Sequence, residues 1–160
     1  MRCACERFLF KMESFHPILV HFPIALLLAA LLIETLGLLF SKQHWHRVSL
    51  WNLTLGAAGA AVAVLTGRQA MAVAKHSMEI YRIMELHERL GYGVLALTIL
   101  IAGCRLLARD RISRKTRWML WALLAAACGL MAFSAHLGGR MVYEFGVGGS
   151  YGHRSGIVIQ

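Results

Sequence analysis

The feature that most constrains the fold is an apolar run from Pro17 to Phe40 that contains a single charged residue, Glu34. As a helix this run would measure roughly 36 Å at about 1.5 Å per residue, and a bilayer core is about 30 Å thick. Pro17 suits the first helical position, where the missing N–H needs no partner. Pro23 lies deeper and frees a backbone carbonyl, so we expect a local kink beside His21. The run therefore predicts a transmembrane helix.

Three further apolar runs follow the first one, and the connectors between them are short. Hydrophobic residues make up 58% of the chain and charged residues 16%, which is little charge for a soluble domain. We expect an all-α polytopic membrane protein, a four-helix bundle of up-down-up-down topology. The expected layout is an interfacial segment at 1–15, a transmembrane domain at 16–148 and a flexible tail at 149–160. Within the transmembrane domain we expect helical extensions over 71–90 and spans of about 17–40, 49–70, 90–108 and 118–137.

The formal net charge of +9 comes from basic residues that lie between the apolar runs. This placement is typical of membrane flanks, and no basic stripe alternates with aromatic residues, so we expect a lipid bilayer as partner and no nucleic acid. We define side A as the face where the first span begins and side B as the opposite face. The connector 105–117 on side B holds six basic residues against one acid, Asp110. The local density of positive charge in this connector predicts that side B is cytoplasmic and that both termini are extracytoplasmic.

An even number of spans brings histidines from both ends of the chain to side A. His21, His87 and His136 belong to three different expected helices and lie at similar depth. A histidine inside a span is costly unless it has a partner or a ligand. His16 is five residues from His21, about 140° round an ideal helix, so the two cannot easily serve one centre, and we expect His16 to cap its helix. His44 and His46 fall in the side-B connector, where we expect a solvated segment.

A b-type haem is the first hypothesis for this cluster, with His21 and either His87 or His136 as the axial pair. Glycines at this level would leave room for a flat ring, and arginines could meet its propionates. The glycines are Gly67, Gly91, Gly93, Gly138 and Gly139, and the arginines are Arg68, Arg89 and Arg140. Such a protein would be an electron carrier.

Two alternatives stay open for the same residues. His21, His87 and His136 could hold a transition metal, with Glu85 or Glu88 orienting a ligand. In the cofactor-free alternative the histidines hydrogen-bond across helices, Arg68 pairs with Glu85 or Glu88, and the protein is an accessory or interaction subunit of a membrane complex.

Other polar residues add little chemistry. Glu34 stands alone in the side-B half of its span, and we expect a hydrogen bond to Thr or Asn of the second span rather than a proton relay. Cys3 and Cys5 are too few thiolates for a closed zinc site. No catalytic triad, phosphate-binding loop or catalytic carboxylate pair is apparent, so we expect an electron carrier or accessory protein rather than an enzyme.

Three motifs resemble those of a bacterial membrane family catalogued as a domain of unknown function, number twenty-two thirty-one. They are HPILVHFPIAL from His16, HERLG from His87, and HLGGRMVY from His136, which continues into GVG at Gly146. The resemblance implies a four-helix integral protein of the bacterial inner membrane. A redox protein or membrane complex as partner would fit it, but it implies no reaction. It marks His16, His21, His87 and His136 without assigning their chemistry.

Overall fold

The computed structural model describes residues 16–73, 78–108 and 112–147, which are helical apart from short turns, with no strand among them. The helices are α2 (His16–Leu19), α3 (His21–Phe40), α4 (Gln43–Val73), α5 (Met78–Ala108) and α6 (Arg114–Tyr143). The predicted all-α fold is confirmed. The expected segments 1–15 and 149–160, with Cys3, Cys5 and Asp110, lie outside the described residues.

The helices extend beyond the apolar spans expected from the sequence. α4 begins at Gln43 rather than near 49, and α5 runs without a break from Met78 to Ala108. Hydropathy marks only the part of a helix that crosses the hydrocarbon, whereas backbone hydrogen bonding continues into polar residues. The first helix is interrupted at Val20, beside His21, which is where Pro23 predicts a kink.

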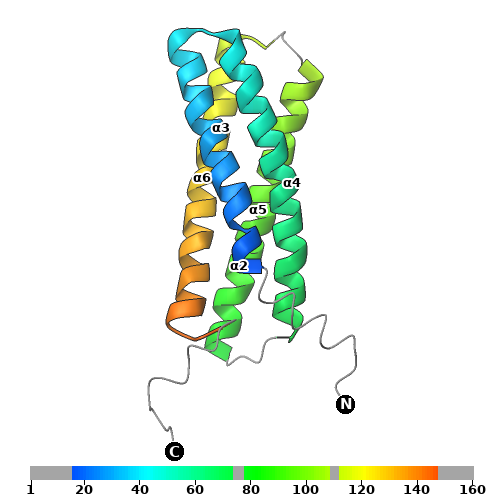
Figure 1. Cartoon of the computed structure of the whole chain (residues 1–160), viewed down its shortest axis with the longest axis vertical. Coiled ribbons are helices and arrows are strands. Elements are labelled where there is room, and N and C mark those ends of the chain that lie inside the picture. Colours follow the sequence, from blue (N-terminus) through cyan, green and yellow to red (C-terminus); the bar gives the residue numbers. More distant parts are fainter. Residues whose placement is uncertain (1–15, 74–77, 109–111, 148–160) are drawn as a thin grey trace, which may run out of the picture.

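The long helices pack in a ring in which each contacts two others (Figure 1). α3 packs along α4, α4 along α5, α5 along α6, and α6 closes the ring against α3. Within the described residues the backbones of α3 and α5 do not approach each other closely, nor do those of α4 and α6, so these pairs lie diagonally across the bundle. This arrangement decides which side chains can meet on the bundle axis.

Four helices are long and apolar enough to cross a membrane: His16–Phe40, Gln43–Met71, Met78–Ala108 and Arg114–Tyr143. Inside the bundle, Leu27, Leu53 and Ile101 are fully buried. Large apolar side chains also cover the outside, where Leu107 is 88% exposed. An outer surface of this kind is stable in lipid and not in water, so the chain is a multi-pass membrane protein in contact with the bilayer.

Small residues set the close approach of α3 and α4. A Cβ atom added at Gly56 would lie 2.8 Å from Leu27 Cδ2, a distance that side chains do not tolerate. Helix association in lipid depends on such close packing. Lipid tails are as apolar as the helix surfaces, so no hydrophobic effect drives the helices together. The glycine- and alanine-rich stretch of the second span therefore lets α3 and α4 pack closely.

Candidate functional site

His16 opens the first helix on side A and is half-buried against α4. Its Nδ1 atom lies 3.1 Å from Thr66 Oγ1. The Thr66 hydroxyl donates its own hydrogen to a backbone carbonyl of α4, so the imidazole Nδ1–H must be the donor in this contact. Gly67 makes room for the ring, because a Cβ atom there would lie 3.0 Å from His16 Cε1.

His87 is held in the same manner by the other helix pair. Its Nδ1 atom lies 2.8 Å from the Ser134 carbonyl oxygen on α6 and 3.0 Å from Ser134 Oγ. A carbonyl oxygen only accepts, so His87 carries its proton on Nδ1. Gly138 lies one turn beyond Ser134, and a Cβ atom added there would be 3.4 Å from His87 Cε1.

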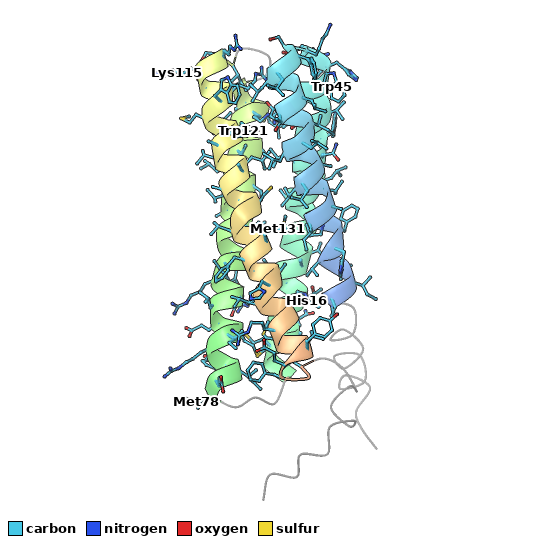
Figure 2. The ribbon with its side chains drawn as sticks, turned by 90° about the vertical axis from the view of Figure 1, so that its left-hand side faces the viewer. His16, Trp45, Met78, Lys115, Trp121 and Met131 are labelled. Atoms are coloured by element: carbon cyan, nitrogen blue, oxygen red, sulfur yellow. The ribbon has the colours of Figure 1, made fainter. Side chains whose placement is uncertain are left out.

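The two imidazoles belong to helices on one diagonal of the bundle. α2 and α3 form the first span and α5 the third, and positive charges on the two imidazoles would repel each other. Figure 2 shows His16 near the side-A end, at a height between Met131 and Met78. The hydrogen bonds that place the two rings run through Nδ1, and the Ala63 backbone is a further hydrogen-bonding neighbour of His16. Each ring is therefore fixed through Nδ1 by a neighbouring helix.

The other two histidines of the predicted cluster lie on the outer surface. His21 is exposed, and its Nδ1 donates to the Pro17 carbonyl oxygen at 2.6 Å within its own helix. His136 is also exposed and interacts electrostatically with Glu144. No hydrogen bond joins either imidazole to His87 in the described part of the chain, and their role as ligands stays a prediction.

No group of three or more His, Cys, Asp or Glu side chains in the described ranges is arranged to hold a metal ion. The described residues therefore do not form a three-histidine site.

Each arginine predicted to meet haem propionates contacts a glutamate in this structure. Arg140 Nη2 lies 2.9 Å from Glu144 Oε2, and hydrogen bonding from Arg140 holds the pKa of Glu144 below its usual range. The remaining pairs are Arg89 Nη2 to Glu85 Oε1 at 2.6 Å and Arg68 Nε to Glu88 Oε1 at 3.7 Å. The last of these is the pairing that the cofactor-free alternative predicts.

A second polar cluster lies near side B and was not predicted. Glu34 is 2% exposed, and its carboxylate contacts side chains from the three other long helices. Oε1 lies 2.9 Å from His46 Nδ1 on α4, and Oε2 lies 2.8 Å from Arg105 Nη2 on α5. Arg117 Nη1 on α6 is farther, at 3.8 Å from Oε1. One carboxylate thus links all four spans.

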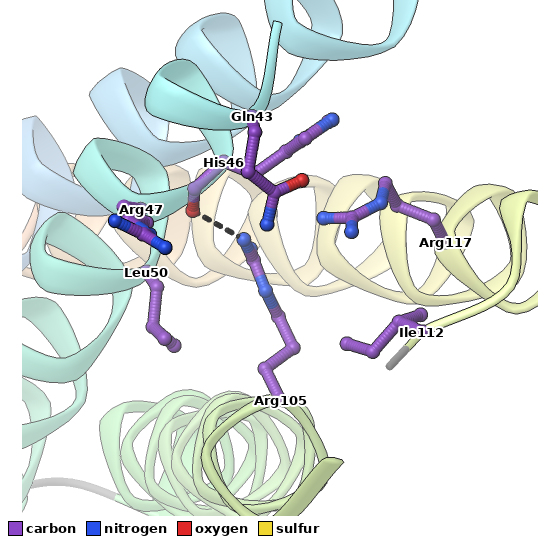
Figure 3. A pocket seen from close by; sticks show the side chains of 7 residues that line it. All are labelled: Gln43, His46, Arg47, Leu50, Arg105, Ile112 and Arg117. Carbon is purple, nitrogen blue, oxygen red and sulfur yellow. Dashed lines mark hydrogen bonds between the residues drawn. The ribbon is translucent and has the colours of Figure 1, made fainter. Parts of the chain in front are cut away.

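Arg105 divides its hydrogen bonds between the backbone and a hydroxyl group. Nη2 donates to the His46 carbonyl oxygen at 2.6 Å, drawn as the dashed line in Figure 3, and Nη1 donates to Ser49 Oγ at 3.2 Å. Glu34 Oε2 is therefore close to a guanidinium but receives no well-directed hydrogen bond from the described residues. We attribute this to Nη2, whose N–H points toward the backbone carbonyl instead.

A shallow pocket opens beside this cluster. Arg117 faces it from one side and Arg105 from another, with Gln43 between them (Figure 3). Glu34 is the one acidic residue that the described ranges place in this half of the bundle. The pocket is lined by Gln43, His46, Arg47, Leu50, Arg105, Ile112 and Arg117. It is therefore rich in positive charge.

Two expectations about this end of the bundle are wrong. Glu34 does not bond to Thr or Asn of the second span, and His46 is not in a solvated connector but is 7% exposed. α4 begins at Gln43, which carries His46 into the helix and toward the carboxylate. The available signal was depth: an acid inside a span needs a cation at the same level, and Arg105 and Arg117 each lie within about one turn of their apolar runs.

Comparison with known protein families gives a match over residues 13–150 to a family described as "Predicted membrane protein (DUF2231)". Comparisons with curated proteins and with solved structures give no match. The matched range covers all four long helices, both polar clusters and the three motifs that carry the resemblance. The chain therefore belongs to the DUF2231 family of predicted membrane proteins.

Proposed function

We propose that the protein binds a b-type haem between His16 and His87 and carries electrons within the membrane. One observation carries this proposal: two half-buried imidazoles on diagonal helices, each held through Nδ1. Iron in b-type haems can be held by two imidazoles from different helices of a bundle. His16 replaces His21 as the partner of His87 in this proposal, because His21 lies on the outer surface.

The donor set fits such a group. Histidines that bind metals usually donate their other ring N–H to a carbonyl, carboxylate or hydroxyl, which fixes the tautomer and raises the basicity of the ligating nitrogen. Thr66 and Ser134 have this role for His16 and His87. The bound haem would supply one-electron chemistry, and the chain would hold and orient the two imidazoles. Leu137, one turn from Ser134, is 6% exposed and would help to exclude water.

The three arginines predicted to meet haem propionates already have acidic partners. Arg68, Arg89 and Arg140 each contact a glutamate, so a contact with propionates would require an exchange of partners. The proposal depends on the histidine pair alone. The dense basic connector on side B further favours a bacterial inner membrane in which the pair lies toward the extracytoplasmic face, within reach of a redox protein there.

The test is an absorption spectrum of protein expressed with adequate haem supply and purified in mild detergent. We expect a Soret band that shifts on reduction with dithionite. His16→Ala and His87→Ala should each lose most of the band. His21→Ala and His136→Ala are matched controls, since each removes an exposed imidazole, and they should keep it.

Two results would contradict the proposal. A colourless wild-type protein would leave the transition-metal alternative, which elemental analysis then decides, or the accessory-subunit alternative. A coloured protein that loses its band in His21→Ala and keeps it in His16→Ala would return the ligand role to the outer histidine.

Gly138→Val, which crowds the His87 ring, should weaken the band more than Gly139→Val, whose Cβ atom has nothing within 4 Å.

A further inference from the structure

We propose that the side-B pocket is a binding site for a phosphate oxyanion, supplied by a lipid headgroup or by free inorganic phosphate. The proposal is independent of the histidine pair on side A. It starts from the charges around Glu34. Arg105 and Arg117 both lie within 4 Å of this one carboxylate, at 2.8 and 3.8 Å. A single negative charge cannot neutralise both guanidinium groups.

Solvent water screens this excess positive charge only weakly, because both arginine side chains are largely buried. The Arg105 side chain is 5% exposed and the Arg117 side chain 11% exposed. A buried charge without a counterion is costly in a protein interior and more so within a membrane. Glu34 is the one acid that the described residues place here, so an anion that enters the pocket would add negative charge beside the two guanidinium groups.

Arg117 has hydrogen-bonding capacity left for such an anion. Its guanidinium makes only the long 3.8 Å contact with Glu34 among the ion pairs of the described residues, whereas both terminal nitrogens of Arg105 are already engaged. A guanidinium carries five N–H donors in a planar fork that matches the oxygens of a phosphate group. The Arg117 side chain also faces the pocket (Figure 3).

The ends of two helices add to the positive field. α4 begins at Gln43 and α6 at Arg114, so both helices direct their amino-terminal ends toward this pocket. The amino-terminal end of a helix carries a partial positive charge and unpaired N–H groups, which favour anions. Leu50 and Ile112 give the pocket an apolar edge at the end of the spans, where a lipid phosphodiester would lie.

The test compares Arg117→Gln with Arg114→Gln. Both variants remove one positive charge from the first turn of α6, but Arg114 is exposed and outside the pocket. Wild-type protein in nonionic detergent is titrated with short-chain phosphatidylglycerol and, separately, with inorganic phosphate. Binding is followed by the shift in thermal unfolding temperature. Arg117→Gln should weaken binding by on the order of tenfold, because it removes charge-assisted hydrogen bonds, and Arg114→Gln by less than about threefold.

A second variant separates binding from structural support. Glu34→Gln removes the competing carboxylate, so it should tighten phosphate binding even as it destabilises the ligand-free protein. Stabilisation by phosphatidylglycerol alone assigns the site to a lipid headgroup, and stabilisation by inorganic phosphate as well assigns it to phosphate in general. The proposal is overturned if neither probe binds, if Arg114→Gln weakens binding as much as Arg117→Gln does, or if Glu34→Gln weakens binding.

Discussion

Changing Glu34 to Gln keeps the size of the side chain and removes the negative charge that three other helices contact. The carboxylate is 2% exposed, and Arg105, its nearest cationic partner, is 5% exposed. Removing one member of a buried ion pair typically costs about 3–5 kcal/mol, because the remaining charge loses its counterion. Arg105 keeps its bonds to the His46 carbonyl and Ser49 Oγ, so we expect a loss near the lower limit, about 3 kcal/mol.

The measurement is the free energy of unfolding in mixed micelles, from a reversible titration with a denaturing detergent followed by circular dichroism. Glu85→Gln is the matched control, because Glu85 pairs with Arg89 on an exposed face of α5. An exposed pair of this kind contributes about 0.5 kcal/mol or less. The reasoning fails if both substitutions cost the same, or if Glu34→Gln raises the free energy of unfolding.

Two further predictions concern helix packing and pH. Gly37→Ala should destabilise the bundle by about 1–3 kcal/mol, because its Cβ atom would lie 2.7 Å from the buried His46 ring. Gly103→Ala, with nothing within 4 Å, should show no loss in the same unfolding assay, and equal losses would refute the packing argument. Arg140→Gln should raise the pKa of Glu144 toward 4.5, measured by carbon-13 NMR titration. The lowered pKa means that this pair stabilises the folded state above about pH 4.5 and loses its effect as the pH falls through the folded pKa. An unchanged pKa would contradict the assignment.

The span count could be predicted because hydropathy is a property of segments. A segment of about twenty apolar residues satisfies its backbone hydrogen bonds inside a membrane by forming a helix, whichever segments lie beside it. The grouping of histidines toward side A follows from the same count. Which histidine faces inward does not, because it depends on the rotation of each helix. The spacing of His16 and His21 excludes a shared centre, but it leaves open which ring turns toward the bundle axis.

The side-B cluster shows a different limit. Glu34, His46 and Arg105 are far apart in the sequence, and each alone has an ordinary explanation as a lone acid or a connector residue. Their meeting depends on where α4 begins, and helix limits are the least reliable feature of a sequence-based prediction. An unpaired acid inside a span still demands a partner, and a search for cations at its depth points to Arg105 and Arg117.

The most direct test of the central claim is the tautomeric state of two imidazoles. If His16 and His87 are held by Thr66 and Ser134, both rings carry their proton on Nδ1 and keep Nε2 available for a ligand. Long-range nitrogen-15 NMR correlations on histidine-labelled, cofactor-free protein, assigned with His16→Ala and His87→Ala, distinguish the two tautomers. We predict an unprotonated Nε2 in both rings. A proton on Nε2 of either ring would contradict the arrangement from which the proposed function is argued.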